Sequence, residues 1–265
     1  MENILQAVER ARAGRPDPAN EASVRTDRST AQEFQRGRVV ELNQNLLRSR
    51  RIVAQDSKDP DARAFDILRT QVLRTMDMRK MQFLAVTSPT AGCGKTVTAI
   101  NLALSIARYP DRPVLLIDMD FKKPQVAGCL GLEFDNDLLA VRHRRALLSD
   151  GVIETRVGDN ALMILPTGAV ASGSAELLAS RELGDVLQQI KRDYPSAIVV
   201  IDLPPVLTGD DVLAILPQVD GVLLVAAAGI TTPSEIEECS KQLHSAEIVR
   251  VVLNKAQELA TSSYY

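Results

Sequence analysis

The sequence lacks any apolar run long enough to cross a membrane. A spanning helix needs roughly 20 consecutive apolar residues, and the longest runs here are far shorter. The chain starts Met1-Glu2-Asn3, without a basic stretch followed by an apolar block, so we expect no signal peptide. We therefore expect a cytoplasmic protein without a transmembrane segment of its own.

Cysteine and histidine are scarce and scattered. Cys93, Cys129 and Cys239 form no Cys-x-x-Cys pair, which favours reduced thiols over disulfides or a zinc site. Neither His143 nor His244 has a second histidine or cysteine at ligand spacing. There are no internal repeats. We therefore expect both histidines to be surface or otherwise satisfied residues.

Charge is divided unevenly along the chain. Residues 1–80 carry 16 Lys and Arg against 12 Asp and Glu, whereas residues 81–265 carry 15 against 22. The acidic remainder argues against nucleic-acid binding. The basic part either touches an anionic lipid or acidic partner, or is a solvated linker.

The most informative stretch is residues 87–96, Thr-Ser-Pro-Thr-Ala-Gly-Cys-Gly-Lys-Thr. It follows an apolar run and precedes a helical pattern, and this order predicts a P-loop. Small residues let backbone N–H groups approach phosphate. Lys95 would face the β- and γ-phosphates of ATP, and the Thr96 hydroxyl would ligate Mg²⁺. Pro89 departs from the full pattern, which asks for glycine there. The nucleotide-binding residues are expected to be Ala91, Gly92, Cys93, Gly94, Lys95 and Thr96.

Two further apolar runs end in carboxylates. Residues 113–117 lead into Asp118 and Asp120, and residues 197–201 lead into Asp202. Continuous Val, Ile and Leu runs are typical of strands in a parallel sheet covered on both faces. Ligands bind at the carboxyl edge of such sheets, so we expect these acids to converge with Lys95. The alternative is that each aspartate merely caps the following helix.

The alternation of elements predicts an α/β fold, a doubly wound and mostly parallel sheet of a P-loop NTPase with a partly disordered N-terminal extension. We expect a largely flexible extension over 1–59, the ATPase domain over 60–256 and a tail over 257–265. Apolar spacing also predicts a helix over 60–79. Further strands are expected near 82–87, 113–118, 161–166, 197–202, 221–227 and 249–254, and further helices near 94–108, 174–192, 211–217 and 233–245.

Residues 60–256 resemble the bacterial tyrosine kinases of capsule and exopolysaccharide synthesis. The similar motifs are Leu-Arg-Thr at 68–70, Asp-Met-Asp-Phe-Lys-Lys-Pro at 118–124, Leu-Pro-Thr-Gly at 165–168, Ala-Glu-Leu-Leu-Ala-Ser at 175–180, Asp-Leu-Pro-Pro at 202–205 and Val-Leu-Asn-Lys at 252–255.

This resemblance implies an ATP- and Mg²⁺-dependent tyrosine autokinase that regulates polysaccharide synthesis and export. Lys95, Asp118, Asp120 and Asp202 would be catalytic, with Asp118 accepting the tyrosine proton and Asp120 supporting it. Thr96, Asp118 and Asp202 would hold the metal, and Asn254 would contact adenine. It also implies self-assembly and a membrane adaptor or polysaccharide co-polymerase that recruits the chain to the inner face of the membrane.

Two features depart from the family pattern. The oligomerisation helix usually reads Glu-x-x-Arg-x-x-Arg, but the matching positions here are Arg63, Asp66 and Arg69. Arg63 could still pair with Asp66 of a neighbour. The family's tyrosine-rich tail is reduced to Tyr264 and Tyr265, which we expect to be the phosphorylated residues.

The other two tyrosines, Tyr109 and Tyr194, lie at helix ends, where we expect them to pack.

Three alternative functions stay open. The first is a positioning or partition ATPase, which usually has a lysine where this chain has Thr90. The second is an iron–sulphur carrier ATPase, which needs a Cys-x-x-Cys pair that this chain lacks. The third is an ATP-binding regulator without kinase activity.

Overall fold

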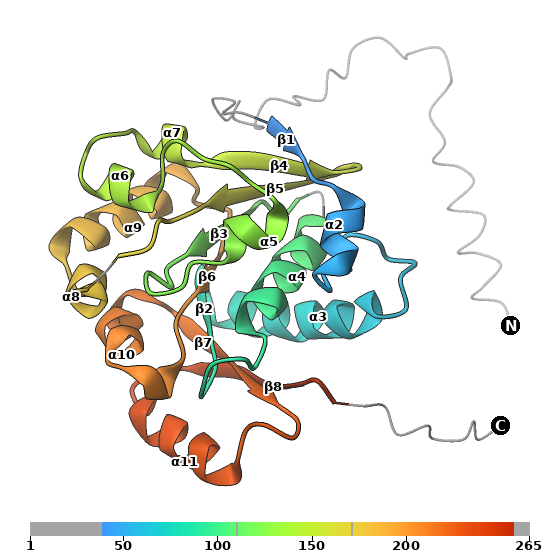
Figure 1. The fold of residues 1–265 in the computed structure, drawn as a ribbon, viewed down its shortest axis with the longest axis vertical. Helices are drawn as coiled ribbons and strands as arrows, with labels where there is room; N and C mark the ends of the chain where they lie inside the picture. Colours follow the sequence, from blue (N-terminus) through green and yellow to red (C-terminus); the bar gives the residue numbers. More distant parts are fainter. Residues whose placement is uncertain (1–38, 110, 171, 257–265) are drawn as a thin grey trace, which may run out of the picture. The chain divides into compact units, whose positions relative to one another are not determined.

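The computed structural model describes residues 39–256 except 110 and 171. Its strands form one sheet in the order β1-β4-β5-β3-β6-β2-β7-β8, in which neighbours are parallel except β4 and β5 (Figure 1). Their bounds are β1 Val39–Glu41, β2 Phe83–Thr87, β3 Val114–Asp118, β4 Ile153–Val157, β5 Asn160–Leu165, β6 Ile198–Asp202, β7 Gly221–Ala227 and β8 Ile248–Asn254. The predicted mostly parallel sheet is confirmed.

Helices connect these strands. They are α2 Gln44–Ser49, α3 Ala62–Arg79, α4 Lys95–Ala107, α5 Val126–Leu130, α6 Leu138–Arg142, α7 Leu148–Gly151, α8 Ser174–Leu178, α9 Arg181–Asp193, α10 Asp211–Ile215 and α11 Pro233–Gln242, with 3-10 turns at Val206–Thr208 and Leu216–Gln218. Within the described part of the chain, no helix is both long and apolar enough to span a bilayer.

The sheet separates two apolar cores because successive side chains of a strand point to opposite faces. Leu84 and Val86 of β2 pack with α3 and α4, whereas Phe83 and Ala85 face the core that contains the apolar residues of α9. Every residue of β2, β3, β6 and β7 is buried. The fold is therefore doubly wound, as its continuous apolar runs predict.

The N-terminal extension is shorter than expected, because residues 39–59 belong to the folded domain. β1 pairs in parallel with β4, and Leu47 and Ile52 are fully buried in the core with α4. β1 and β4 are missed by the search for continuous apolar runs, because β1 has only three residues and the middle three residues of β4 are polar. The rest of the expected extension and the tail lie outside the described residues.

The helix expected over 174–192 is two helices. Ser180 separates α8 from α9, and its hydroxyl accepts a hydrogen bond from the Leu183 N–H at 3.3 Å, which caps the start of α9. A serine side chain that bonds backbone groups favours a helix start over a helix interior. On α3, two apolar residues that follow the helical spacing, Ala64 and Ile67, are exposed.

The carboxylate of Asp66 on α3 is engaged within its own chain. It accepts hydrogen bonds from the Ser105 hydroxyl at 2.7 Å and the Arg69 guanidinium at 3.2 Å, and it pairs with Arg108. These contacts join α3 to α4. An ion pair between Asp66 and Arg63 of a second copy would have to compete with three internal partners.

Asn101 of α4 holds residues 51–54 against this helix through side-chain hydrogen bonds. Its side-chain oxygen accepts the N–H groups of Val53 and Ala54 at 2.8 and 3.0 Å, and its amide donates to the carbonyls of Arg51 and Val97. The side chain is fully buried. Buried backbone groups that lose their partners are costly, so this residue holds residues 51–54 in place.

We expect Asn101→Ala to lower the free energy of unfolding by roughly 2–4 kcal/mol, because two buried N–H groups lose their acceptor. Urea unfolding measures the change. Asn136→Ala is the control, since the structure gives Asn136 no side-chain hydrogen bond within the described residues. Equal stability of the two variants would contradict the anchoring role.

Candidate functional site: a phosphate loop facing buried carboxylates

Three adjacent strands bring the site together at one edge of the sheet. β6 lies between β3 and β2, and Asp118 at the end of β3 is in register with Asp202 at the end of β6. The loop after β2 leads into α4, which begins at Lys95. Parallel strands end at a common edge, so the predicted convergence of the acids with Lys95 is observed.

Glycines shape the phosphate loop. Gly92 and Gly94 have φ angles of +83° and +88°, which favour glycine. A Cβ atom on Gly94 would come within 2.3 Å of the side-chain nitrogen of Asn254. That amide donates to the Cys93 carbonyl at 2.9 Å, and the Lys255 ammonium donates to the Gly92 carbonyl at 2.7 Å. The end of β8 therefore holds the loop in shape.

Lys95 lies among carboxylates. Its ammonium group is 2.8 Å from Asp120 and 3.5 Å from Asp202, and its side chain is 12% exposed. Burial works against its charge, but the charges of Asp202 and Asp120 outweigh this and raise the pKa of Lys95. The Thr96 hydroxyl donates to Asp202 at 2.7 Å. Lys95 and Thr96 are thus held close to the acids at the start of α4.

The surroundings of Asp118 and Asp202 disfavour the charged form of each carboxyl group. Burial, together with the charge of Asp202, raises the pKa of Asp118 to about 7. Burial likewise raises the pKa of Asp202 to about 6, although Lys95 and Thr96 oppose this shift. Asp118 accepts the N–H groups of Asp120, Gln125 and Val126 at 2.9 to 3.1 Å. One oxygen of Asp202 is buried without a hydrogen-bond partner.

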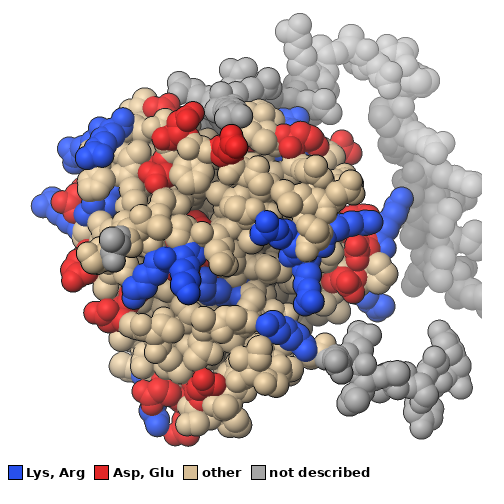
Figure 2. All heavy atoms as spheres, viewed as in Figure 1, with Lys and Arg blue, Asp and Glu red and all other residues tan. Residues whose placement is uncertain are grey.

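A cavity of about 500 Å³ opens in front of the loop. Asp120 lines it, whereas Asp118 and Asp202 are not among its lining residues. Figure 2 shows Lys and Arg side chains gathered in the middle of the viewed face and acids mostly around its margin. Sequence reasoning missed Lys255 as a loop contact, although its place after a strand at the same edge was a usable signal. The lining residues are Ala91, Gly92, Gly94, Lys95, Thr96, Val97, Asp120, Lys122, Lys123, Gln125, Pro204, Pro205, Thr208 and Lys255.

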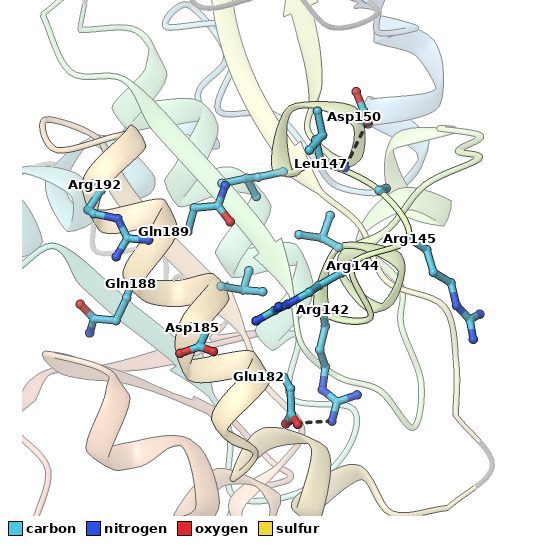
Figure 3. A pocket seen from close by; sticks show the side chains of 14 residues that line it. Arg142, Arg144, Arg145, Leu147, Asp150, Glu182, Asp185, Gln188, Gln189 and Arg192 are labelled. Atoms are coloured by element: carbon cyan, nitrogen blue, oxygen red, sulfur yellow. Dashed lines mark hydrogen bonds and ion pairs between the residues drawn. The ribbon is translucent and has the colours of Figure 1, made fainter.

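A larger cavity, about 670 Å³, lies elsewhere between α9 and the segment that contains α6 and α7. Arg142, Arg144 and Arg192 line it, and the Arg142 guanidinium reaches toward Glu182 at 3.6 Å (Figure 3). None of its lining residues belongs to the phosphate loop or to the strand-end acids. Chemistry, and not size, therefore identifies the nucleotide site.

The donor set suits magnesium rather than zinc. Within the described residues, no group of three or more His, Cys, Asp or Glu side chains could hold a metal unaided. Thr96 and Asp202 nevertheless offer adjacent oxygens, and the unpartnered oxygen of Asp202 is available to a metal-bound water. Mg²⁺ keeps several waters and uses few protein ligands together with phosphates. The residues present therefore fit a nucleotide with Mg²⁺.

Comparison with known proteins identifies the family of the chain. The AAA domain family matches residues 81–246. Tyrosine-protein kinase CpsD of Streptococcus pneumoniae is 31% identical over 181 residues, covering 66% of this chain and 77% of that protein. Tyrosine-protein kinase YwqD of Bacillus subtilis is 26% identical over 226 residues, covering 84% and 93%.

This chain belongs to the bacterial tyrosine-protein kinase family. The solved BceF tyrosine kinase domain is 26% identical with a TM-score of 0.66, covering 81% of this chain and 90% of that one. Likeness also extends to the MinC:MinD cell division complex of Aquifex aeolicus, at 21% identity and a TM-score of 0.55. That second likeness concerns the fold alone. The chain thus carries a nucleotide-binding P-loop site on the expected scaffold.

The pKa of Asp202 leads to a pH-dependent prediction. Between the ordinary aspartate pKa near 4 and about 6, the folded chain binds a proton that the unfolded chain lacks. The contribution of Asp202 to stability therefore falls as pH rises through this window. We therefore expect the free energy of unfolding of Asp202→Asn, measured relative to wild type, to rise by about 2–3 kcal/mol between pH 4 and pH 8.

Urea unfolding at several pH values, without nucleotide or Mg²⁺, measures this difference. Asp159→Asn is the matched control because Asp159 is exposed. A stability difference for Asp202→Asn that stays constant from pH 4 to pH 8 would show that Asp202 does not titrate in this window.

Proposed function

We propose that the chain is an ATP-dependent protein-tyrosine autokinase that regulates capsule or exopolysaccharide synthesis and export. The observation that carries the proposal is the ion pair between Lys95 and Asp120. The Lys95 ammonium lies 2.8 Å from the Asp120 carboxylate, and both residues line the cavity. Phosphoryl transfer needs mainly positioning and charge stabilisation, and this site provides both. The relatives named tyrosine-protein kinases support tyrosine as the acceptor.

The phosphate-binding part consists of the loop backbone over 91–96 and Lys95. When ATP binds, Lys95 would exchange its bonds to Asp120 and Asp202 for phosphate oxygens, which carry more negative charge. Thr96 would ligate Mg²⁺ directly, and Asp118 and Asp202 would hold it mostly through water. The bound Mg²⁺ would neutralise charge on the β- and γ-phosphates. Asn254 holds the loop, and contact with adenine is its further proposed role.

The proton of the attacking tyrosine needs an acceptor, since an ordinary tyrosine has a pKa near 10. We assign this role to Asp120, because it lines the cavity and Asp118 does not. Asp118 would act behind it: its carboxylate binds the backbone N–H of Asp120 at 3.1 Å and so positions that residue. This assignment exchanges the roles that the family resemblance implies for the two aspartates.

The proposed acceptors Tyr264 and Tyr265 lie outside the described residues. A tail from about residue 256 spans at most roughly 30 Å, so another copy must lie close for transfer between chains. We therefore propose a homo-oligomer, and a membrane adaptor or polysaccharide co-polymerase that recruits the chain to the inner face of the cytoplasmic membrane. A pull-down from native membranes that recovers no such protein would contradict the adaptor.

Lys95→Met keeps the length of the side chain but removes its charge. We expect transfer of phosphate from ATP to fall by on the order of a hundredfold or more, as for other lost transition-state charges. Nucleotide binding should weaken as well, which fluorescent ATP titration measures. Lys191→Met is the matched control, because Lys191 is exposed on α9 and lies outside the cavity. Full activity of Lys95→Met would refute the phosphate-binding role.

The direct test mixes the purified full chain with Mg²⁺ and labelled ATP, with and without membranes of the native host. We expect label on tyrosine, and none with Lys95→Met. Nucleotide binding without any tyrosine phosphorylation would favour instead an ATP-binding regulator of the same machinery. Omitting Mg²⁺ should abolish transfer, because the phosphate charge is then not neutralised.

A further inference from the structure

Tyr109 is accessible, contrary to the expectation that it packs at its helix end. It follows the last residue of α4 and is 44% exposed. The structure gives its hydroxyl no hydrogen-bond partner within the described residues. Tyr194, in contrast, is half-buried, and burial raises the pKa of its hydroxyl. Of the two tyrosines in the described part of the chain, Tyr109 is therefore the one that an enzyme can reach.

Three arginines lie near this tyrosine, together with the carboxylates of Asp77 and Asp111. The Arg69 guanidinium lies 4.5 Å from the centre of the ring. Arg74 and Arg112 line the same cavity of about 520 Å³ as Tyr109. Arg112 forms two bonds to Asp77, at 2.7 and 2.8 Å, whereas Arg74 forms no ion pair with any residue that the structure describes.

We propose that Tyr109 is a phosphorylation site of this kinase, with the surrounding arginines as its phosphate-binding cradle. The proposal rests on the proposed kinase activity. The tyrosine oxygen bonds to the γ-phosphorus of ATP, the bond to the β-phosphate oxygen breaks, and ADP leaves. The tyrosine proton passes to Asp120 of the active site. Arg74 has no ion-pair partner in the part of the chain that the structure describes, and guanidinium groups bind phosphate strongly.

The phosphate must come from another copy of the chain. Lys95 begins α4 and Tyr109 follows its end, so a straight helix separates them by about 20 Å. α4 is buried along most of its length and cannot bend back on itself. A phosphorylated Tyr109 would therefore report an encounter between two copies.

Phosphorylation would rearrange the ion pairs on α3. The group adds about −1.5 to −2 charge beside Asp77, which repels it, while Arg112 is attracted. We expect Arg112 to shift from Asp77 toward the phosphate. Two exposed apolar residues lie on α3, the helix whose ion pair would change. They are Ile67, 53% exposed, and Met78, 67% exposed.

Mass spectrometry of the full chain after incubation with ATP and Mg²⁺ tests the site. We expect phosphate on the peptide that contains Tyr109, and its loss in Tyr109→Phe but not in Tyr194→Phe. Phosphate on Tyr264 or Tyr265 with none on Tyr109 would overturn this inference and leave the proposed kinase standing. Phosphate on no tyrosine would overturn both.

A mixing experiment tests transfer between copies. Isotope-labelled Lys95→Met chain, which cannot transfer phosphate itself, is incubated with unlabelled wild type and ATP. We expect phosphate on Tyr109 of the labelled chain. If only the wild-type copies carry it at Tyr109, transfer occurs within one chain, and the geometric argument from α4 is wrong.

The cradle has its own readout. A broad-specificity tyrosine phosphatase should remove phosphate from Tyr109 several-fold faster in Arg74→Gln than in wild type, because a guanidinium no longer covers it. Arg63→Gln is the matched control, since Arg63 is an exposed arginine on the same helix, outside the cavity. Equal removal rates in Arg74→Gln and Arg63→Gln would refute the cradle.

Discussion

The candidate site depends on a cluster of one lysine and three aspartates at the carboxyl edge of the sheet. The Lys95 ammonium lies between Asp120 and Asp202, and Asp118 lies on the neighbouring strand. Three buried carboxylates outnumber the one cation beside them, and burial together with the charge of Asp202 raises the pKa of Asp118 to about 7. A site with such an excess attracts a divalent cation. The same carboxylates are the groups that we propose to hold Mg²⁺ beside the nucleotide.

Helix α4 connects this site to the rest of the domain. Its first residues complete the phosphate loop, Asn101 in its middle holds residues 51–54 through buried hydrogen bonds, and Ser105 near its end binds Asp66 of α3. A single helix therefore ties together the active site, the N-terminal segment and the α3 surface.

Two cavities of similar size illustrate why chemistry must decide function. The arginine-lined cavity beside α9 is the larger, about 670 Å³, but it contains neither the glycine-rich loop nor the strand-end acids. The cavity in front of the loop combines backbone N–H groups at the start of a helix, a mostly buried lysine and the carboxylate of Asp120, which lines the cavity. These are the groups that phosphoryl transfer requires, so the smaller cavity is the better candidate.

The sequence by itself determined the phosphate loop, the strand-end acids and the central strands, because each depends on a short local pattern. It also determined that the sheet is mostly parallel, since buried parallel strands have continuous apolar runs. Only the tertiary structure decided that residues 39–59 join the domain, that Asp120 and not Asp118 lines the cavity, and that Tyr109 is exposed. Those features depend on contacts between distant segments, such as Asn101 with Val53, and side-chain burial after packing is not encoded in any local spacing.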